Sequence, residues 1–380
     1  GLTHGATAMS APPRSHWPVA VIGGGIAGCA AALTLAQQGI AVAWIAPETV
    51  FEDKPGESLA AAALPLLDEL GLGALLADPA HRQSQASYTS WGSDALLERH
   101  AAAQPGGLGH VIDRPRFEAS LIAETAALAD ITRLRDTVLT VQRQPGAWTL
   151  STASGATLSA DLVIDATGRK SLLGRAQARQ KRVDRLVAAY AFLSQVETDI
   201  DPTPATIIEA VSGGWWYATL LADRRLALNF YSDPDLLPRR IGQRPDLWQA
   251  LVADTRYISQ WVESAGYALS GPPGLASAGT VWLEQAAGSD WLAVGDAAIS
   301  FDPLSAHGMT TALWTGVEAA KAAAKAIGGD HDALADYATR LRLGVEHYLG
   351  ERRSIYARER RFTSHPFWQR RLHDADLADR

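Results

Sequence analysis

The glycine-rich turn at residues 23–28, Gly-Gly-Gly-Ile-Ala-Gly, constrains the fold of this chain more than any other feature. It follows the apolar stretch 17–22 and precedes an Ala- and Leu-rich segment that continues to Gln38, which is the pattern of a strand, a tight turn and a helix. In a G-x-G-x-x-G turn the first glycine permits the turn, the second lets the backbone approach a pyrophosphate, and the third lets helix and strand pack closely. The pattern predicts a Rossmann-like dinucleotide site with contacts at Gly23, Gly25, Ile26, Ala27 and Gly28.

The strand predicted next, at residues 40–45, lacks the acidic residue that usually follows it and binds a ribose hydroxyl. Ala46 occupies that place. Glu48, two residues later, is the candidate substitute. The alternative is that another group holds the adenosine ribose, and the sequence leaves both open.

Residues 295–309 form a second strand–loop–helix pattern. An apolar strand ends in Gly295-Asp296, a loop with Pro303 follows, and an Ala-rich helix is predicted from Thr310 onward, preceded by free N–H groups. A helix N-terminus carries partial positive charge and suits an acceptor-rich, partly anionic ring, whereas an acid directly after a strand suits a hydroxylated linker. A flavin meets both requirements, with contacts at Gly295, Asp296, Pro303, Gly308 and Met309; an ordinary structural corner is the alternative.

Residues 54–59 are predicted to open an amphipathic helix that ends at Gly71, with Glu57 and Ser58 in its first turn. Such a position suits a helix terminus structurally, and it also suits contact with a cofactor.

Two further sequence motifs have both a functional and a structural interpretation. Arg114 precedes a proline, so we expect an extended backbone there and an arginine able to reach a phosphate; a surface ion pair is the alternative. The buried strand that ends at Asp165 leads through Ala-Thr to Gly168, which is typical of a turn beside a bound dinucleotide.

Strand-like segments dominate residues 186–270 and predict a substrate domain. Consecutive aromatic residues in one of these strands place rings on both faces. One face can stack on an aromatic substrate, and core packing is the alternative. The predicted substrate-pocket residues are Tyr88, Trp91, Trp215, Trp216 and Tyr217.

We therefore expect an α/β fold with an α+β substrate part, in which a Rossmann-like FAD-binding domain is interleaved with a β-sheet-rich substrate domain and followed by helices. The expected divisions are a flexible leader at 1–16, the discontinuous FAD-binding domain at 17–65, 105–180 and 271–330, the substrate domain at 66–104 and 181–270, and a helical segment at 331–380. The arginines of that last segment are expected to form a solvated helix face or to dock an acidic partner.

Composition excludes several classes of protein. The net charge of −7 argues against nucleic-acid binding, and the single cysteine excludes a disulfide framework and a multi-cysteine metal site, so no metal is predicted. No apolar run approaches the roughly 18 residues that span a bilayer, and the N-terminus lacks the pattern of a signal peptide. We expect no membrane contact and a cytoplasmic location by default.

Four motifs occur in an order that resembles the FAD-dependent monooxygenase superfamily, which includes aromatic hydroxylases, geranylgeranyl reductases and tryptophan halogenases. They are residues 23–28, Arg114 within Val-Ile-Asp-Arg, residues 165–168 and residues 295–309. The resemblance implies that the glycine turn holds the FAD pyrophosphate and that Arg114 lies near the phosphates and the ribityl chain. It further implies that Asp296 bonds the ribityl chain and that the Asp-Pro loop cradles the isoalloxazine.

The halogenase branch is similar at Gly56-Glu57-Ser58, which resembles its G-E-[AS] station. Its catalytic lysine, however, is replaced by Thr89, and its W-x-W-x-I-P signature is replaced at residues 215–220. A threonine cannot form a haloamine, so halogenation is not expected.

A narrower resemblance is to the maturation flavoproteins of cysteine tryptophylquinone enzymes, such as the lysine-oxidase and glycine-oxidase maturases. It rests on Gly-Trp-Trp-Tyr at 214–217, Asp-Pro-Leu-Ser at 302–305 with Gly308, and Pro-Phe-Trp at 366–368 with Arg371. It implies hydroxylation of a tryptophan side chain in a partner polypeptide.

The sequence thus predicts an FAD-dependent monooxygenase that uses O₂ to hydroxylate an electron-rich aromatic ring through a C4a-hydroperoxyflavin. His307 and Glu57 are the candidate catalytic residues, for proton delivery or substrate orientation. No second nucleotide motif is present, so NAD(P)H binds transiently or a separate flavin reductase supplies electrons. The alternatives are a halogenase-like or reductase enzyme acting on a small secondary metabolite, and a non-catalytic flavin-binding protein.

Overall fold

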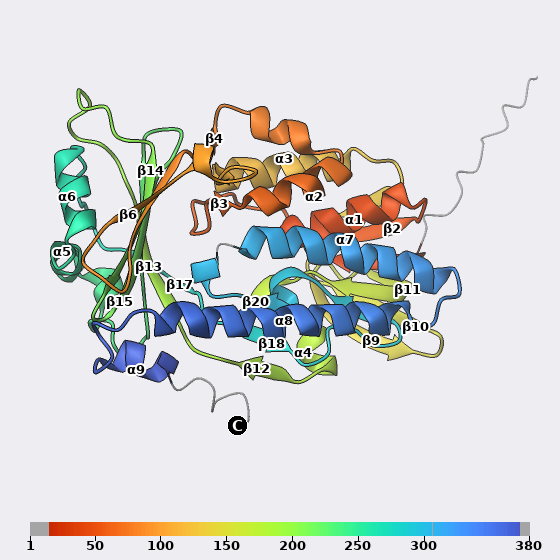
Figure 1. Ribbon diagram of the computed structural model, residues 1–380. Coiled ribbons are helices and arrows are strands. Elements are labelled where there is room, and N and C mark those ends of the chain that lie inside the picture. The colour runs from red at the N-terminus through yellow and green to blue at the C-terminus, as the bar shows by residue number, and fades with distance from the viewer. Residues whose placement is uncertain (1–14, 306, 373–380) are drawn as a thin grey trace, which may run out of the picture.

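Two seven-stranded sheets organise the computed structural model, which describes residues 15–305 and 307–372. Residues 1–14 of the predicted leader and residues 373–380 lie outside the described part. Figure 1 shows the two sheets side by side, with the long helices α7 and α8 running across the first sheet toward the second. Within the described residues no helix is long and apolar enough to cross a membrane.

The first sheet has the order β8-β2-β1-β11-β10-β9, with β19 beside β11. Its central strands are parallel and buried, because near-continuous apolar runs suit a sheet covered on both faces. An antiparallel hairpin, β9-β10, extends one side. The strands are β1 (His16–Ile22), β2 (Val42–Ile45), β8 (Ile131–Leu134), β9 (Val138–Gln144), β10 (Ala147–Thr152), β11 (Thr157–Asp165) and β19 (Trp291–Ala293).

Helices rich in alanine pack closely beside this sheet. A Cβ added to Gly316 would lie 2.6 Å from the Ala27 carbonyl oxygen, and one added to Gly295 would lie 2.8 Å from the Ala27 Cβ, so α1 and α7 meet where only small residues fit. The helices are α1 (Ile26–Gln37), α2 (Leu64–Glu69), α3 (Arg114–Ala126), α4 (Gly174–Gln177), α7 (Gly308–Ile327) and α8 (Ala333–Ala357).

The second sheet is mostly antiparallel and has the order β17-β13-β16-β15-β14-β5-β6. Helices α5 (Pro245–Ala253) and α6 (Tyr257–Ser264) cover its outer face, and its inner face is turned toward the first domain (Figure 1). The strands are β5 (Ala86–Ser90), β6 (Leu97–His100), β13 (Val187–Leu193), β14 (Ala205–Val211), β15 (Gly214–Leu220), β16 (Leu226–Ser232) and β17 (Gly274–Ser277). Because β17 pairs with β13, it lies in this sheet and not in the FAD-binding division where residues 271–330 were expected.

Two three-stranded sheets connect the large ones. One is β3 (Ser58–Leu59), β7 (His110–Val111) and β4 (Arg82–Gln83), and the other is β12 (Gln180–Arg182), β18 (Val281–Leu283) and β20 (Ile299–Ser300). The helix expected to begin near residue 54 is therefore wrong at its start, because Ser58 pairs with Val111 as a strand and α2 begins only at Leu64. Short 3₁₀ turns occupy 61–63, 73–77, 101–103, 168–170, 241–243, 295–297 and 303–305.

Buried arginines attach the C-terminal helices to two acids, one between β12 and β13 and one directly after β16. Arg352 in α8 lies 2.5 Å from the Asp184 carboxylate, and Arg371 in α9 (Pro366–Leu372) lies 3.1 Å from Asp184 and 2.8 Å from Asp233. Both arginines are 2% exposed. The expected solvated face is thus wrong for these two residues, which neutralise buried carboxylates.

We expect Arg371→Met to lower the free energy of unfolding by about 3–5 kcal/mol, because it removes the buried cation that pairs with both Asp184 and Asp233 and leaves each acid one arginine short. The control is Arg244→Met, whose side chain is 49% exposed and pairs with the exposed Asp246, and which should cost under about 1 kcal/mol. Urea unfolding of both variants measures the difference. Equal losses would contradict the role assigned to the buried pair.

Candidate active site

The glycine turn is built by two close backbone approaches. Gly23 has a φ of +121°, and a Cβ there would lie 2.0 Å from the Ala166 carbonyl oxygen. A Cβ on Gly28 would lie 2.2 Å from the Gly23 carbonyl oxygen. Gly25, in contrast, has no atom within 4 Å of its Cβ position, so it borders open space at the start of α1.

A cavity of about 350 Å³ lies in front of this turn. The first turn of α1 has neither an acidic residue nor a side-chain cap, so its N–H groups can bind an anion. Ile26 and Ala27 are buried, and what they can offer a ligand is backbone. These residues fit a dinucleotide phosphate. The cavity is lined by Ile22, Gly23, Gly24, Gly25, Ile45, Pro47, Asp136, Thr137, Val138, Ala166, Thr167, Gly168 and Lys170.

Two side chains that were predicted to contact the cofactor bind other groups of the protein instead. Both Asp165 carboxylate oxygens accept hydrogen bonds, one from the N–H and hydroxyl of Thr167 and the other from the N–H groups of Leu173 and Gly174. Asp165 therefore shapes the turn and is not free to hold a ligand, which corrects its assignment. Glu48 is exposed, pairs with Arg135 at 2.6 Å, and is absent from the cavity lining, so the structure gives its ribose contact no support.

Asp296 lies in the 3₁₀ turn after β19, and we call its position the Asp296 recess because the side chain is exposed although protein surrounds the carboxyl. Gly295 enters the turn with a φ of +55° and donates its N–H to the Thr315 hydroxyl at 2.8 Å. The Asp296 side chain is exposed, yet the surrounding protein shields the carboxyl from bulk water and raises its pKa, against the opposing charges of Arg169, Arg114 and Lys54. A carboxyl that is open to a ligand and ringed by cations suits a hydroxylated chain next to phosphates.

The loop after Asp296 leads into α7. Pro303 lies in a 3₁₀ turn, Gly308 is the exposed first residue of α7, and Met309 is buried beneath it. No atom lies within 4 Å of a Cβ placed on Gly308, so the helix start faces open space. This is the geometry required to present N–H groups to a flat ring.

Arg114 departs from its predicted backbone but keeps a central position. It is the first residue of α3 and not extended, because Asp113 caps the helix by accepting the Arg116 N–H and because a proline is tolerated in a first turn. Its guanidinium donates to the Gly56 carbonyl oxygen and to Glu118, each at 3.0 Å. Its charge opposes the rise in the pKa of both Asp296 and Glu57, and its hydrogen bond to Gly56 holds it beside Glu57.

Glu57 is the most perturbed acid near the recess. It is 2% exposed, its Oε1 has no hydrogen-bond partner, and burial raises its pKa to about 7 against the opposing charge of Arg114. Next to it, the Ser58 hydroxyl lies 2.6 Å from the Tyr217 hydroxyl, which joins β3 to the second sheet. Burial, followed by the charge of Glu57, raises the pKa values of both Tyr217 and Tyr231. We call Glu57, Ser58, Tyr217 and Tyr231 the interface cluster.

The predicted aromatic pocket divides between the two faces of the second sheet. Trp216 is 1% exposed on the outer face, where it stacks on Phe230 with ring centroids 4.6 Å apart, and Tyr88 packs on the same side and bonds Glu98. Neither can reach a ligand between the domains, so both assignments are corrected. The reason is that α5 and α6 give the outer face a core of its own.

Trp215 and Trp91 lie on the inner face but serve to anchor the C-terminal helices. The Trp215 indole donates to the Tyr356 hydroxyl at 3.1 Å, and the Trp91 indole donates to the Ile355 carbonyl oxygen at 2.9 Å. Trp215 is 1% exposed, so its substrate contact is not supported. Of the predicted pocket residues, Tyr217 is the one that the structure brings to the interface cluster.

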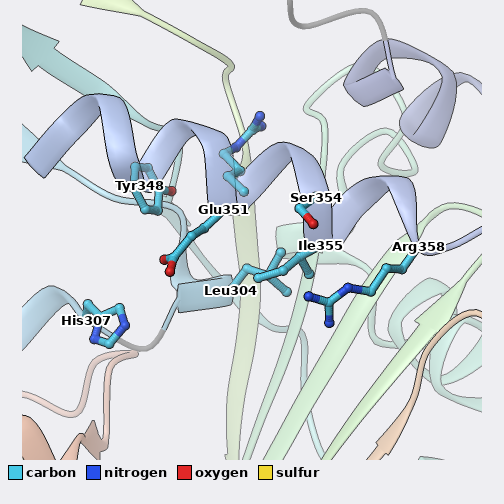
Figure 2. A pocket seen from close by; sticks show the side chains of 8 residues that line it. Leu304, His307, Tyr348, Glu351, Ser354, Ile355 and Arg358 are labelled. Carbon is cyan, nitrogen blue, oxygen red and sulfur yellow. The ribbon is translucent and has the colours of Figure 1, made fainter.

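His307 is exposed and precedes α7 on the rim of two hollows. Figure 2 shows the first, of about 250 Å³, where Tyr348 and Glu351 extend from α8 toward the loop that carries Leu304 and His307. The second, of about 390 Å³, is lined by Ala62, Pro65, Leu66, His307, Thr310, Thr311 and Trp314. An imidazole in this position is a surface group, and the structure does not support a buried proton donor here. Among the described residues no cluster of acids, histidines or cysteines could hold a metal ion.

One residue that the sequence reasoning missed is Asn229. It is 1% exposed in β16, next to Tyr217 in register, and neither amide atom has a partner. The available signal was an amide inside the otherwise apolar stretch Leu226-Ala-Leu-Asn-Phe-Tyr.

We expect Gly25→Ala to weaken FAD binding with little effect on the unliganded fold, because its methyl group would enter the space before the turn without touching protein. The matched variant Gly28→Ala should instead destabilise the fold, since its Cβ would clash with a backbone oxygen. FAD titration and thermal unfolding separate the two. Tight FAD binding by Gly25→Ala would contradict the assignment.

The raised pKa of Glu57 predicts a pH-dependent stability with a definite sign. The folded protein holds this proton up to about pH 7, whereas the unfolded chain releases it near pH 4.5. The free energy of unfolding is therefore highest below about pH 4.5, falls as pH rises above that value, and has lost this contribution above about pH 7. Glu57→Gln removes this loss and should gain about 3 kcal/mol over wild type across that window. Urea unfolding at a series of pH values tests it, with exposed Glu98→Gln as control. Parallel wild-type and Glu57→Gln curves would be inconsistent with a buried neutral carboxyl.

Comparison with known proteins supports a flavoprotein. The sequence model of the FAD binding domain matches residues 18–103, and that of tryptophan halogenase matches residues 108–379. The FAD-dependent oxidoreductase LodB of Marinomonas mediterranea is 24% identical over 92% of this chain and 95% of its own length. Menaquinone reductase of Mycobacterium tuberculosis is 27% identical over 80% of this chain and 75% of its own length.

Solved structures agree with this fold. The peptidyl tryptophan dihydroxylase QhpG, essential for tryptophylquinone cofactor biogenesis, is 25% identical with a TM-score of 0.77 over 94% of this chain and 78% of its own. The flavin-dependent halogenase CmlS has a TM-score of 0.81 at 22% identity over 96% and 69%. With the glycine turn, the Asp296 recess and a family match over most of its length, the chain belongs to the tryptophan halogenase family, is a flavin-dependent oxidoreductase and uses FAD as its cofactor.

Proposed function

We propose that this chain is a monooxygenase that hydroxylates an electron-rich aromatic ring, with a tryptophan side chain of a partner polypeptide as the favoured substrate. The reaction consumes O₂, two electrons and two protons, converts an aromatic C–H into C–OH and releases water. Bound FAD supplies the redox chemistry with O₂. NAD(P)H, directly or through a flavin reductase, is the proposed electron source.

The observation that carries this proposal is the buried carboxyl of Glu57, whose pKa of about 7 lets it give or take a proton at neutral pH. It comes from the FAD-binding side of the molecule, next to the Ser58–Tyr217 hydrogen bond that joins that side to the second sheet. Ring hydroxylation requires a group that moves a proton at the substrate, in a site that excludes water. The interface cluster offers such a group in Glu57 and is buried from water.

The second sheet also disfavours halogenation. Thr89 is the register partner of Ile208 on the inner face, and none of the described strands of this sheet contains a lysine that could form a haloamine. Lys54, on the other side, is paired with Glu118 at 2.9 Å. The likeness to a peptidyl tryptophan dihydroxylase and to LodB is consistent with a hydroxylase acting on protein-bound tryptophan.

A reductase is the second candidate, because a menaquinone reductase is among the relatives and would use the same FAD site. The two candidates differ in their need for O₂. A reductase transfers electrons to its substrate anaerobically, whereas a monooxygenase forms no product without O₂.

The test uses FAD-loaded protein, reduced anaerobically with dithionite and then mixed with ¹⁸O₂, bromide and a tryptophan-containing peptide as probe. We expect one oxygen-18 atom in the indole ring and no brominated product, detected by mass spectrometry. Glu57→Gln should slow product formation by about 100-fold while retaining FAD, and Tyr88→Phe, on the outer face, is the control. Brominated peptide, or a peptide that gains no oxygen-18 although the reduced flavin is reoxidised, would refute the proposal.

A further inference from the structure

Asn229 occupies the middle of the inner face of the second sheet. In β16 its register partners are Tyr217 on β15 and Tyr190 on β13. Because side chains directly opposite each other share a face, Asn229 lies on the same side as Tyr217, whose hydroxyl meets Ser58. Figure 1 shows β14 and β15 standing between α5 and α6 on one side and the first domain on the other, and Asn229 belongs to the side that faces the first domain.

Folding alone does not account for this amide. Its Nδ2 and Oδ1 atoms are both buried without a hydrogen-bond partner, which costs roughly 1–3 kcal/mol for each such group. Its same-face neighbours in β16, Ala227 and Tyr231, are also buried, and neither pairs with the amide. Glu57 Oε1 is also unpartnered and buried across the domain interface. Orphaned polar atoms from both sides of one interface indicate a ligand whose polar edge they complete.

The chemistry of an amide defines what that edge must carry. Oδ1 accepts a hydrogen bond and Nδ2 donates one, so the matching ligand presents a donor beside an acceptor. An aromatic ring with an N–H in its plane supplies the donor, and the oxygen that hydroxylation adds to such a ring supplies the acceptor. A purely hydrocarbon ring or an oxygen heterocycle lacks the donor.

We propose that Asn229 is the residue that selects the substrate ring, accepting the N–H of an indole at Oδ1 and turning Nδ2 toward the oxygen introduced in the reaction. The aromatic class of the ligand rests on the proposed function. The selection of a ring N–H rests on the unpartnered amide itself. Asn229 acts as a specificity-determining residue, and proton transfer is left to Glu57.

The experiment measures binding to oxidised, FAD-loaded protein, so that turnover is not required. Indole and benzofuran are the probes, because they share shape and differ in the N–H group, and ligand-observed NMR gives their dissociation constants. We expect wild type to bind indole about tenfold more tightly than benzofuran, the value of one hydrogen bond. In Asn229→Leu this ratio should fall close to one, with FAD binding retained.

Thermal unfolding of Asn229→Leu gives a second readout. If the amide serves the ligand, removing two orphaned polar atoms leaves stability unchanged or higher. If it serves the fold through bridging water, stability falls, and that result would overturn the proposal. The control is Phe230→Leu, on the outer face of the same strand, which should lose stability through its contact with Trp216 but keep the indole preference.

The outcomes separate this inference from the proposed function. Equal affinity of wild type for indole and benzofuran, or no binding of either, refutes the role of Asn229 whatever the turnover experiment shows. An indole preference that Asn229→Leu abolishes supports it, even if the peptide experiment yields no oxygenated product and the monooxygenase proposal fails.

Discussion

The position of the loop before α7 depends on one acid, Asp302, which is buried beside α8 where that helix meets the second sheet. Asp302 is fully buried, accepts a hydrogen bond from the Tyr356 hydroxyl at 2.6 Å, and has a raised pKa because burial outweighs the charge of Arg352. The same Tyr356 hydroxyl receives the indole N–H of Trp215 from the second sheet. A carboxylate buried at this depth is stable only with such partners, so α8 supports the loop before α7 although it lies outside the expected Rossmann division.

The sequence predicted the backbone features of the FAD half well, because those features are local. The glycine turn, the strands around it and the helix after residue 308 each follow from short-range patterns. The sequence could not show that Asp165 would satisfy four donors or that Arg352 and Arg371 would turn inward, since those partners come from distant segments. Alternation placed Trp215 and Trp216 on opposite faces, but it could not show which face meets the substrate when both are covered.

The two halves of the candidate site are therefore specified differently. The FAD half is defined mainly by backbone, through glycines that permit close approach and helix starts that present N–H groups. The proposed substrate half instead draws on side chains from opposite domains, Glu57 and Ser58 from one and Tyr217 and Asn229 from the other. Members of this fold can change the second half without disturbing the first, which is consistent with halogenases and a tryptophan dihydroxylase sharing one architecture.

The tight meeting of α1 and α7 at Ala27 has a consequence for the length of the cofactor. Gly316 and Gly295 both lie against Ala27, so α1, the turn that carries Asp296 and α7 share one contact point. On the proposed FAD site, these three elements would hold the pyrophosphate, the ribityl chain and the ring. Because there is no room for an added methyl group, the spacing between these three elements is fixed by close contacts of alanine and glycine. This spacing cannot be changed at one element alone, so a cofactor of different length would require all three elements to move together.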